Sequence, residues 1–164
     1  MFSLVIRENK VVSELKITGL GDDIFSLYNM SWQKPLEDWQ EDPYLTDMRG
    51  ISRHVVRLVR TGERDEDVYA VKETVSEFAN REYAMLRELS HRGAPSVDAA
   101  AVVEGRLDNR GNELPPALVT RYLPFSLPYR VILSRSVTAH EVNQMASALA
   151  LLLEELVFKA AELR

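Results

Sequence analysis

The sequence predicts an α+β fold, with a five-stranded antiparallel sheet, one helix packed on it and one long helix at the carboxyl end. Short runs rich in Val, Ile, Leu and Ala are separated by turn residues. Two Thr-x-x-Glu capping boxes each precede an apolar pattern of helical period. From residue 55 onward the elements therefore follow the order strand, strand, helix, strand, strand, long helix.

Composition limits the classes of function. A chain of 164 residues with 46% hydrophobic and 27% charged residues is an ordinary one-domain globular protein. A net charge of −5 argues against a nucleic-acid partner bound through a dense basic surface. The lack of cysteine rules out disulfides and thiolate metal sites. The apolar runs at both ends are too short for a membrane span, so we expect a cytoplasmic protein.

The amino-terminal third divides into an extension and the start of the main domain. Apolar runs at 2–6 and 11–17 predict a weak hairpin, and Asp22 or Asp23 is a candidate cap for a short helix reaching Met30. We therefore expect an extension over residues 1–30. An aromatic stretch at 32–39 predicts an ordered loop or short helix that packs on another element.

The main domain is expected over residues 31–135. Strands are predicted at 55–60 and 68–72, around a polar turn, and at 99–103 and 117–123. The first capping box, at 74–77, begins a helix that we expect to end near Leu89, because Gly93 and Pro95 follow. The second box, at 138–141, begins a carboxyl-terminal helix assigned to residues 136–164.

Lys72 and Glu82 are the main candidates for a functional pair. In the helix after Lys72, the apolar stripe contains Phe78, Met85, Leu86 and Leu89, with Glu82 on the same stripe. A carboxylate on a core-facing stripe requires a cation, and strand alternation places Lys72 on one chosen face. The alternative is that Glu82 lies at the edge of the stripe and that Lys72 is a surface lysine.

The segment 68–72 (VYAVK) resembles the Val-Ala-Ile-Lys strand of the protein-kinase superfamily, and Glu82 matches the glutamate of its helix C. The segment 118–123 (LVTRYL) resembles the last strand of the kinase small lobe. The resemblance implies an ATP site in which Lys72 and Glu82 hold the phosphates. It further implies roles around adenine for Ala70, the gatekeeper Thr120, and the backbone of Arg121 and Leu123.

A narrower resemblance is to an uncharacterised bacterial family of lipopolysaccharide-kinase-like proteins. It rests on residues 32–39 (WQKPLEDW), 49–57 (RGISRHVVR) and 126–130 (SLPYR). Kinases have three glycines in the phosphate-binding loop. The corresponding segment here has one glycine, and the resemblance implies phosphate contacts from Gly50, Ser52, Arg53 and His54. The alternative is an ordinary hairpin turn with a solvated arginine.

Phosphoryl transfer by kinases requires an aspartate in the catalytic loop and an Asp and Asn that hold magnesium. No aspartate follows Asp108 in this sequence, and Asn143 is the only asparagine after Asn112. We therefore expect no catalytic residue and no metal site in this chain. It is either the nucleotide-binding lobe of a longer kinase-like enzyme or a complete, non-catalytic interaction module of a regulatory, phage or toxin–antitoxin type. Its last residues favour a natural end.

The carboxyl-terminal helix is the candidate interaction surface. Its main apolar residues recur at alternating intervals of three and four. The stripe can fold back on its own domain, pair with a second copy or bind another protein. Its residues are Val142, Met145, Leu149, Leu152 and Leu156.

Overall fold

The computed structural model describes residues 2–7, 14–46, 55–64, 67–123 and 138–161. Two compact units are present. The first contains residues 1–87 and 97–122, and the second contains residues 88–96 and 123–164. The candidate nucleotide site and its supporting elements lie in the first unit, and the long helix lies in the second.

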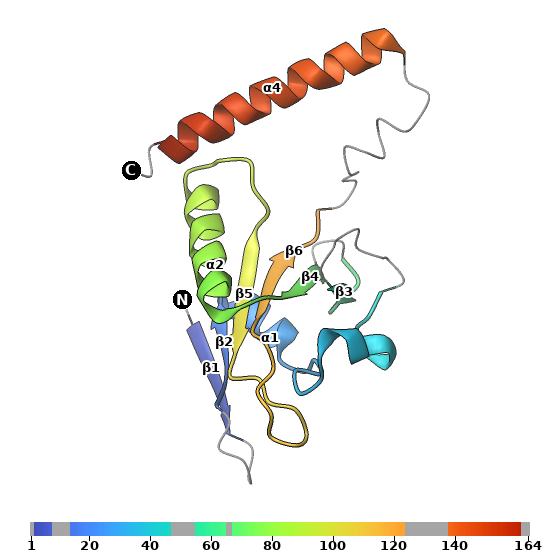
Figure 1. Ribbon diagram of the computed structural model, residues 1–164, viewed down its shortest axis with the longest axis vertical. Helices are drawn as coiled ribbons and strands as arrows, with labels where there is room; N and C mark the ends of the chain where they lie inside the picture. The colour runs from blue at the N-terminus through green and yellow to red at the C-terminus, as the bar shows by residue number, and fades with distance from the viewer. Residues whose placement is uncertain (1, 8–13, 47–54, 65–66, 124–137, 162–164) are drawn as a thin grey trace. The chain divides into compact units, whose positions relative to one another are not determined.

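The first unit is built on an antiparallel sheet with the strand order β1-β2-β5-β6-β4-β3 (Figure 1). The predicted α+β class and antiparallel pairing are confirmed. The amino-terminal hairpin, expected as an extension, belongs to this sheet because β2 pairs with β5, which brings the sheet to six strands. The strands are β1 (Phe2–Arg7), β2 (Glu14–Gly19), β3 (Val56–Arg60), β4 (Val68–Glu73), β5 (Ala99–Glu104) and β6 (Ala117–Arg121).

One face of the sheet packs against the short helix α1 (Gly21–Leu27) and the 3-10 helix η1 (Leu36–Glu41). The segment 32–39 is ordered and packed, as predicted: Trp32 and Trp39 are both buried, with ring centroids 5.2 Å apart in an edge-on arrangement. Their indole N–H groups donate to the carbonyl oxygens of Leu27 and Lys34. Both polar tips are thereby satisfied inside an apolar cluster.

The other face packs against helix α2 (Ser76–His91). Its core-facing side chains are Ala79 and Tyr83, Leu86 packs against them and Leu89 is buried, so the predicted stripe is right for Leu86 and Leu89 and wrong for Phe78 and Met85. Phe78 is 57% exposed and Met85 is 50% exposed. The buried face thus begins at Ala79 in place of Phe78 and keeps the later leucines of the predicted stripe. The small, fully buried Ala79 lets the helix approach the sheet closely.

The turn residues that the sequence indicates lie at the end of α2 and in the turn before β6. Gly93 has φ 67° just after α2, and the amide of Ala94 donates to the carbonyl of Leu89, which closes the helix end. In the turn before β6, the Asp108 carboxylate accepts the amides of Arg110 and Asn112. The side-chain amide of Asn112 also donates to Asp108 Oδ2, and this bond, followed by the backbone bonds, holds the pKa of Asp108 below its usual value.

The predicted cap of α1 is wrong. Leu20 is the N-cap residue and forms no side-chain cap hydrogen bond, while Asp23 lies inside the helix and is buried. The Asp23 carboxylate faces the sheet because cationic and hydroxyl partners on β4 and β6 stabilise it there. A capping role would have left it in solvent.

The second unit contains the long helix α4 (Ala139–Ala161). Its predicted capping box is present: the amide of Thr138 donates to Glu141 Oε2 at 2.7 Å, and the amide of Glu141 donates to Thr138 Oγ1 at 3.3 Å. Within the described part of the chain, no helix is long and apolar enough to cross a bilayer.

Candidate nucleotide site

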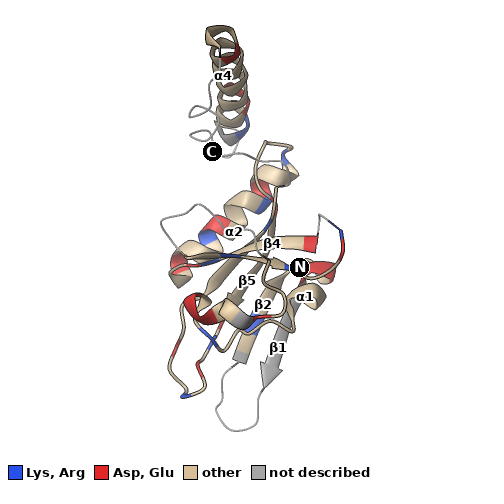
Figure 2. Ribbon diagram, turned by 90° about the vertical axis from the view of Figure 1, so that its right-hand side faces the viewer, with Lys and Arg blue, Asp and Glu red and all other residues tan. Residues whose placement is uncertain are grey.

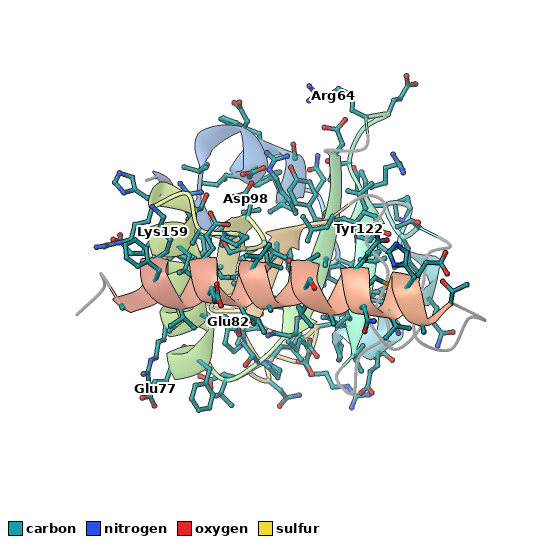
Figure 3. All side chains as sticks on the ribbon, turned by 90° about the horizontal axis from the view of Figure 1, so that it is seen from above. Arg64, Glu77, Glu82, Asp98, Tyr122 and Lys159 are labelled. Atoms are coloured by element: carbon teal, nitrogen blue, oxygen red, sulfur yellow. The ribbon has the colours of Figure 1, made fainter. Side chains whose placement is uncertain are left out.

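Lys72 and Glu82 form the predicted ion pair. Lys72 Nζ lies 2.9 Å from each carboxylate oxygen of Glu82. Lys72 is near the end of β4, and Glu82 is in the second turn of α2, where it is labelled in Figure 3. The side chain of Lys72 is 31% exposed and that of Glu82 is 42% exposed. The pairing is therefore confirmed, and Glu82 lies at the edge of the helix face rather than in the core.

Strand pairing places other predicted residues on the same face of the sheet. Lys72 is opposite Leu118, which packs under α2, and Ala70 is opposite Thr120. Residues two apart on a strand share a face, so Ala70, Lys72 and Thr120 lie together on the α2 side. Ala70 and Thr120 are half-buried. A methyl group at position 70 leaves room above the sheet that a larger side chain would fill.

A groove of about 410 Å³ adjoins the lysine. Its wall combines the Lys72 side chain with the first turn of α2 and Pro115, and Val75 and Phe78 supply its apolar surface. Ala70 and Thr120 are not in its lining. The groove therefore does not include the surface that is expected to face adenine.

Arg121 is predicted to face adenine through its backbone. In the structure both its backbone amide and its guanidinium have partners within the protein. Its amide donates to the carbonyl oxygen of Asp98 at 2.8 Å, so that N–H does not face a ligand. Its guanidinium lies 2.7 Å from Asp23 Oδ1 and 5.5 Å from the centre of the Tyr69 ring. Leu123 is exposed just beyond β6. The side chain of Arg121 therefore holds α1 to the sheet, on the face opposite Lys72.

Tyr69 completes this buried cluster. Its hydroxyl donates to Asp23 Oδ1 at 2.8 Å. Burial, reinforced by the hydrogen bond to the Asp23 carboxylate, raises the pKa of Tyr69 to about 12. The cluster therefore contains a neutral phenol, an anion and a cation.

Arg106 is a large, fully buried side chain that the sequence did not indicate as part of this region. Its side chain is 0% exposed, and Nη1 lies 2.8 Å from Glu73 Oε1. The guanidinium also donates to the carbonyl oxygens of Trp32, Lys34 and Pro115. Burial lowers the pKa of Arg106, and the bond to Glu73 opposes that shift. Arg106 therefore fixes the segment 32–39 to the sheet through Glu73, the residue that follows Lys72 on β4.

The remaining predicted site residues are Gly50, Ser52, Arg53 and His54, which lie outside the described residues. Arg64 lies in the polar turn between β3 and β4, projects away from the sheet in Figure 3 and pairs with Asp67 at 3.1 Å. In the described ranges, no three His, Cys, Asp or Glu side chains gather as they would around a metal ion.

Comparison with protein-family models, curated proteins and solved structures found no match for this chain.

Proposed function

We propose that this chain is a kinase-like nucleotide-binding lobe in which Lys72, oriented by Glu82, binds the phosphates of ATP. The observation that carries the proposal is the two-oxygen ion pair between a strand lysine and a helix glutamate, at 2.9 Å. Kinases use a lysine and a glutamate in this strand-to-helix relation to hold nucleotide phosphates.

The energetics of the pair support a positioning role. An ion pair that is this exposed contributes only about 0–1 kcal/mol to folding stability. Its main physical effect is to fix a flexible ammonium group in one place at the rim of a groove. An ammonium group held in this way binds phosphate as a point charge, through up to three N–H donors.

The proposal covers binding and not transfer. No aspartate follows Asp108 in this sequence, so residues 109–164 offer none of the aspartates that kinases use to hold magnesium and orient the acceptor. Ala70 and Thr120 are the candidate surface for adenine, because they share the Lys72 face and one of them is small.

The test is calorimetric titration of ATP, with and without Mg²⁺, into the chain and three variants. Losing a charge-assisted contact predicts that Lys72→Ala weakens binding about tenfold or more. Glu82→Gln, which removes the anion but keeps the side-chain size, is expected to lie between Lys72→Ala and the parent.

Lys16→Ala is the matched control. Lys16 is also a strand lysine paired with a glutamate, at 4.0 Å from Glu104, but it lies on β2. This variant should bind ATP as the parent does. ATP should also raise the melting temperature of the parent, because a ligand of the folded state stabilises it. Absence of binding by the parent, or equal losses in Lys72→Ala and Lys16→Ala, would refute the proposal.

A further inference from the structure

Helix α2 is held to the sheet at both edges of its buried face. Successive residues of an α-helix are turned by about 100°, so Asn80 and Glu82 lie about 200° apart, at opposite edges of that face. At one edge, Glu82 meets Lys72 of β4. At the other edge, Asn80 meets Glu104, the last residue of β5. Strands β4 and β5 flank β6 in the sheet, so the helix is fastened on both sides of β6.

Glu104 contacts two residues of α2 through one oxygen atom. Its Oε1 atom accepts a hydrogen bond from Asn80 Nδ2 at 2.7 Å and another from Ser76 Oγ at 3.2 Å. Its Oε2 atom lies 4.0 Å from Lys16 Nζ. The Glu104 side chain is 23% exposed and that of Glu82 is 42% exposed, so Glu104 is the more shielded of the two carboxylates. Hydrogen bonds to an ionised acceptor are stronger than bonds between neutral groups, so Glu104 ties the first turns of α2 to β5.

The exposed apolar residues of α2 favour a different rotation of the helix. Phe78 and Met85 are large apolar side chains that lie exposed beside the buried face. Acidic and basic residues lie along the length of the helix (Figure 2), so charged side chains would still face solvent after a turn. Rolling α2 toward Phe78 and Met85 would bury more apolar surface, which is favourable. The same roll would carry Asn80 away from Glu104 and would move Glu82 out of its ion pair.

We propose that Glu104 is a positioning residue for the nucleotide site. By holding Asn80 and Ser76 it opposes the roll of α2, and it thereby keeps Glu82 against Lys72. Glu104 contacts the flank of α2 that faces away from Lys72, so it acts through the helix and not on the ligand. Its effect on ATP binding rests on the proposed function, whereas its effect on the ion pair does not.

The primary test is calorimetric titration of ATP into the full chain and a double-mutant cycle of Glu104 and Glu82. Glu104→Ala should weaken ATP binding about threefold to tenfold, because the Lys72 ammonium group remains but loses its orientation. In a Glu82→Ala background the same substitution should have no further effect, since the residue through which it acts is gone. Equal losses in both backgrounds would show that Glu104 acts independently of the ion pair and would overturn the proposal.

Three further variants separate the hydrogen bonds from the charge. Glu104→Gln keeps an oxygen that accepts from Asn80 and Ser76, so it should bind ATP as the parent does. Asn80→Ala removes the same contact from the helix side and should match Glu104→Ala. Lys16→Ala removes only the contact at Oε2 and should have no effect. A loss in Glu104→Gln as large as that in Glu104→Ala would contradict positioning through these hydrogen bonds.

A second readout does not require ATP. The rate at which an amine reagent acetylates Lys72, measured by peptide mass spectrometry relative to the exposed Lys34, reports whether Glu82 holds the ammonium group. Glu104→Ala should raise this ratio about threefold or more, and Glu104→Gln should leave it unchanged. If the parent does not bind ATP, the proposed function fails while this ratio still tests the positioning role. An unchanged ratio in Glu104→Ala would overturn that role even in a chain that binds ATP.

Discussion

The two faces of the sheet carry ion pairs of opposite character. On the face covered by α1 and η1, Arg106 and Asp23 are buried and each has several hydrogen-bond partners. On the face covered by α2, Lys72 and Glu82 form a pair that remains partly open to solvent. Burial decides what each pair does. The first set ties distant segments to the sheet, and the second holds a charge where a ligand can meet it.

This difference follows from desolvation. A buried guanidinium is stable only when nearly all of its donors are satisfied, which Arg106 achieves with one carboxylate and three carbonyl oxygens. Removing such a group leaves its partners unpaired inside the protein. An exposed lysine has water as an alternative partner, so its removal changes binding far more than folding.

The largest effect is therefore expected for Arg106→Met. The substitution leaves Glu73 and three carbonyl oxygens without their cation, which should lower the free energy of unfolding by about 3–5 kcal/mol. Urea unfolding followed by tryptophan fluorescence measures this, because the guanidinium lies 5.8 Å from the centre of the Trp32 ring.

Arg57→Met is the matched control for this variant. Arg57 also ties the same segment to the sheet, but it is half-buried and donates to the carbonyl oxygens of Leu36 and Glu37. Its loss should lower stability by about 1–2 kcal/mol. If both variants lose the same amount, burial of Arg106 is not the deciding factor.

The second effect depends on pH and involves Tyr69. Because its pKa is about 12 in the folded protein and near 10 when unfolded, Tyr69 contributes stability that is fully present below about pH 10. That contribution is lost as pH rises from 10 through 12, with a slope of at most about 1.4 kcal/mol per pH unit. Stability measured by urea unfolding should therefore fall over this range, and Tyr69→Phe should fall less steeply.

Tyr28→Phe serves as the control for this slope, because Tyr28 is 43% exposed. It should leave the pH dependence of the parent unchanged. Burial also raises the pKa of Tyr83, so a smaller residual slope is expected in Tyr69→Phe. A slope identical to that of the parent would mean that Tyr69 is not the group that resists ionisation.

The sequence predicts the sheet and the exposed pair well because both depend on local patterns. Runs of β-branched residues and alternation locate the strands, and Lys72 and Glu82 are only ten residues apart. The facing of α2 is predicted only in part, right for Leu86 and Leu89 and wrong for Phe78, because apolar periodicity gives Phe78 more weight than Ala79. The close approach of helix and sheet favours the smaller side chain, and this depends on tertiary packing.

The buried pairs are not predictable in the same way. Arg121 meets Asp23 across 98 positions of sequence, and Arg106 meets Glu73 across 33. No spacing rule connects such residues, because strand order brings them together only after the sheet has formed. Asp23 also has a local alternative, the helix cap, which the sequence alone favours. Its real partners appear only with the register of β4 and β6.

The smallest effect on stability, and the sharpest contrast, is expected at the exposed pair. Lys72→Ala and Glu82→Gln should each change the free energy of unfolding by no more than about 1 kcal/mol, because water replaces the lost partner. Urea unfolding under the conditions used for Arg106→Met gives a direct comparison. A loss as large as that of Arg106→Met would show that the pair supports the fold. A small loss of stability together with weakened ATP binding would assign the pair to ligand binding instead. The same substitution would then affect binding without affecting folding.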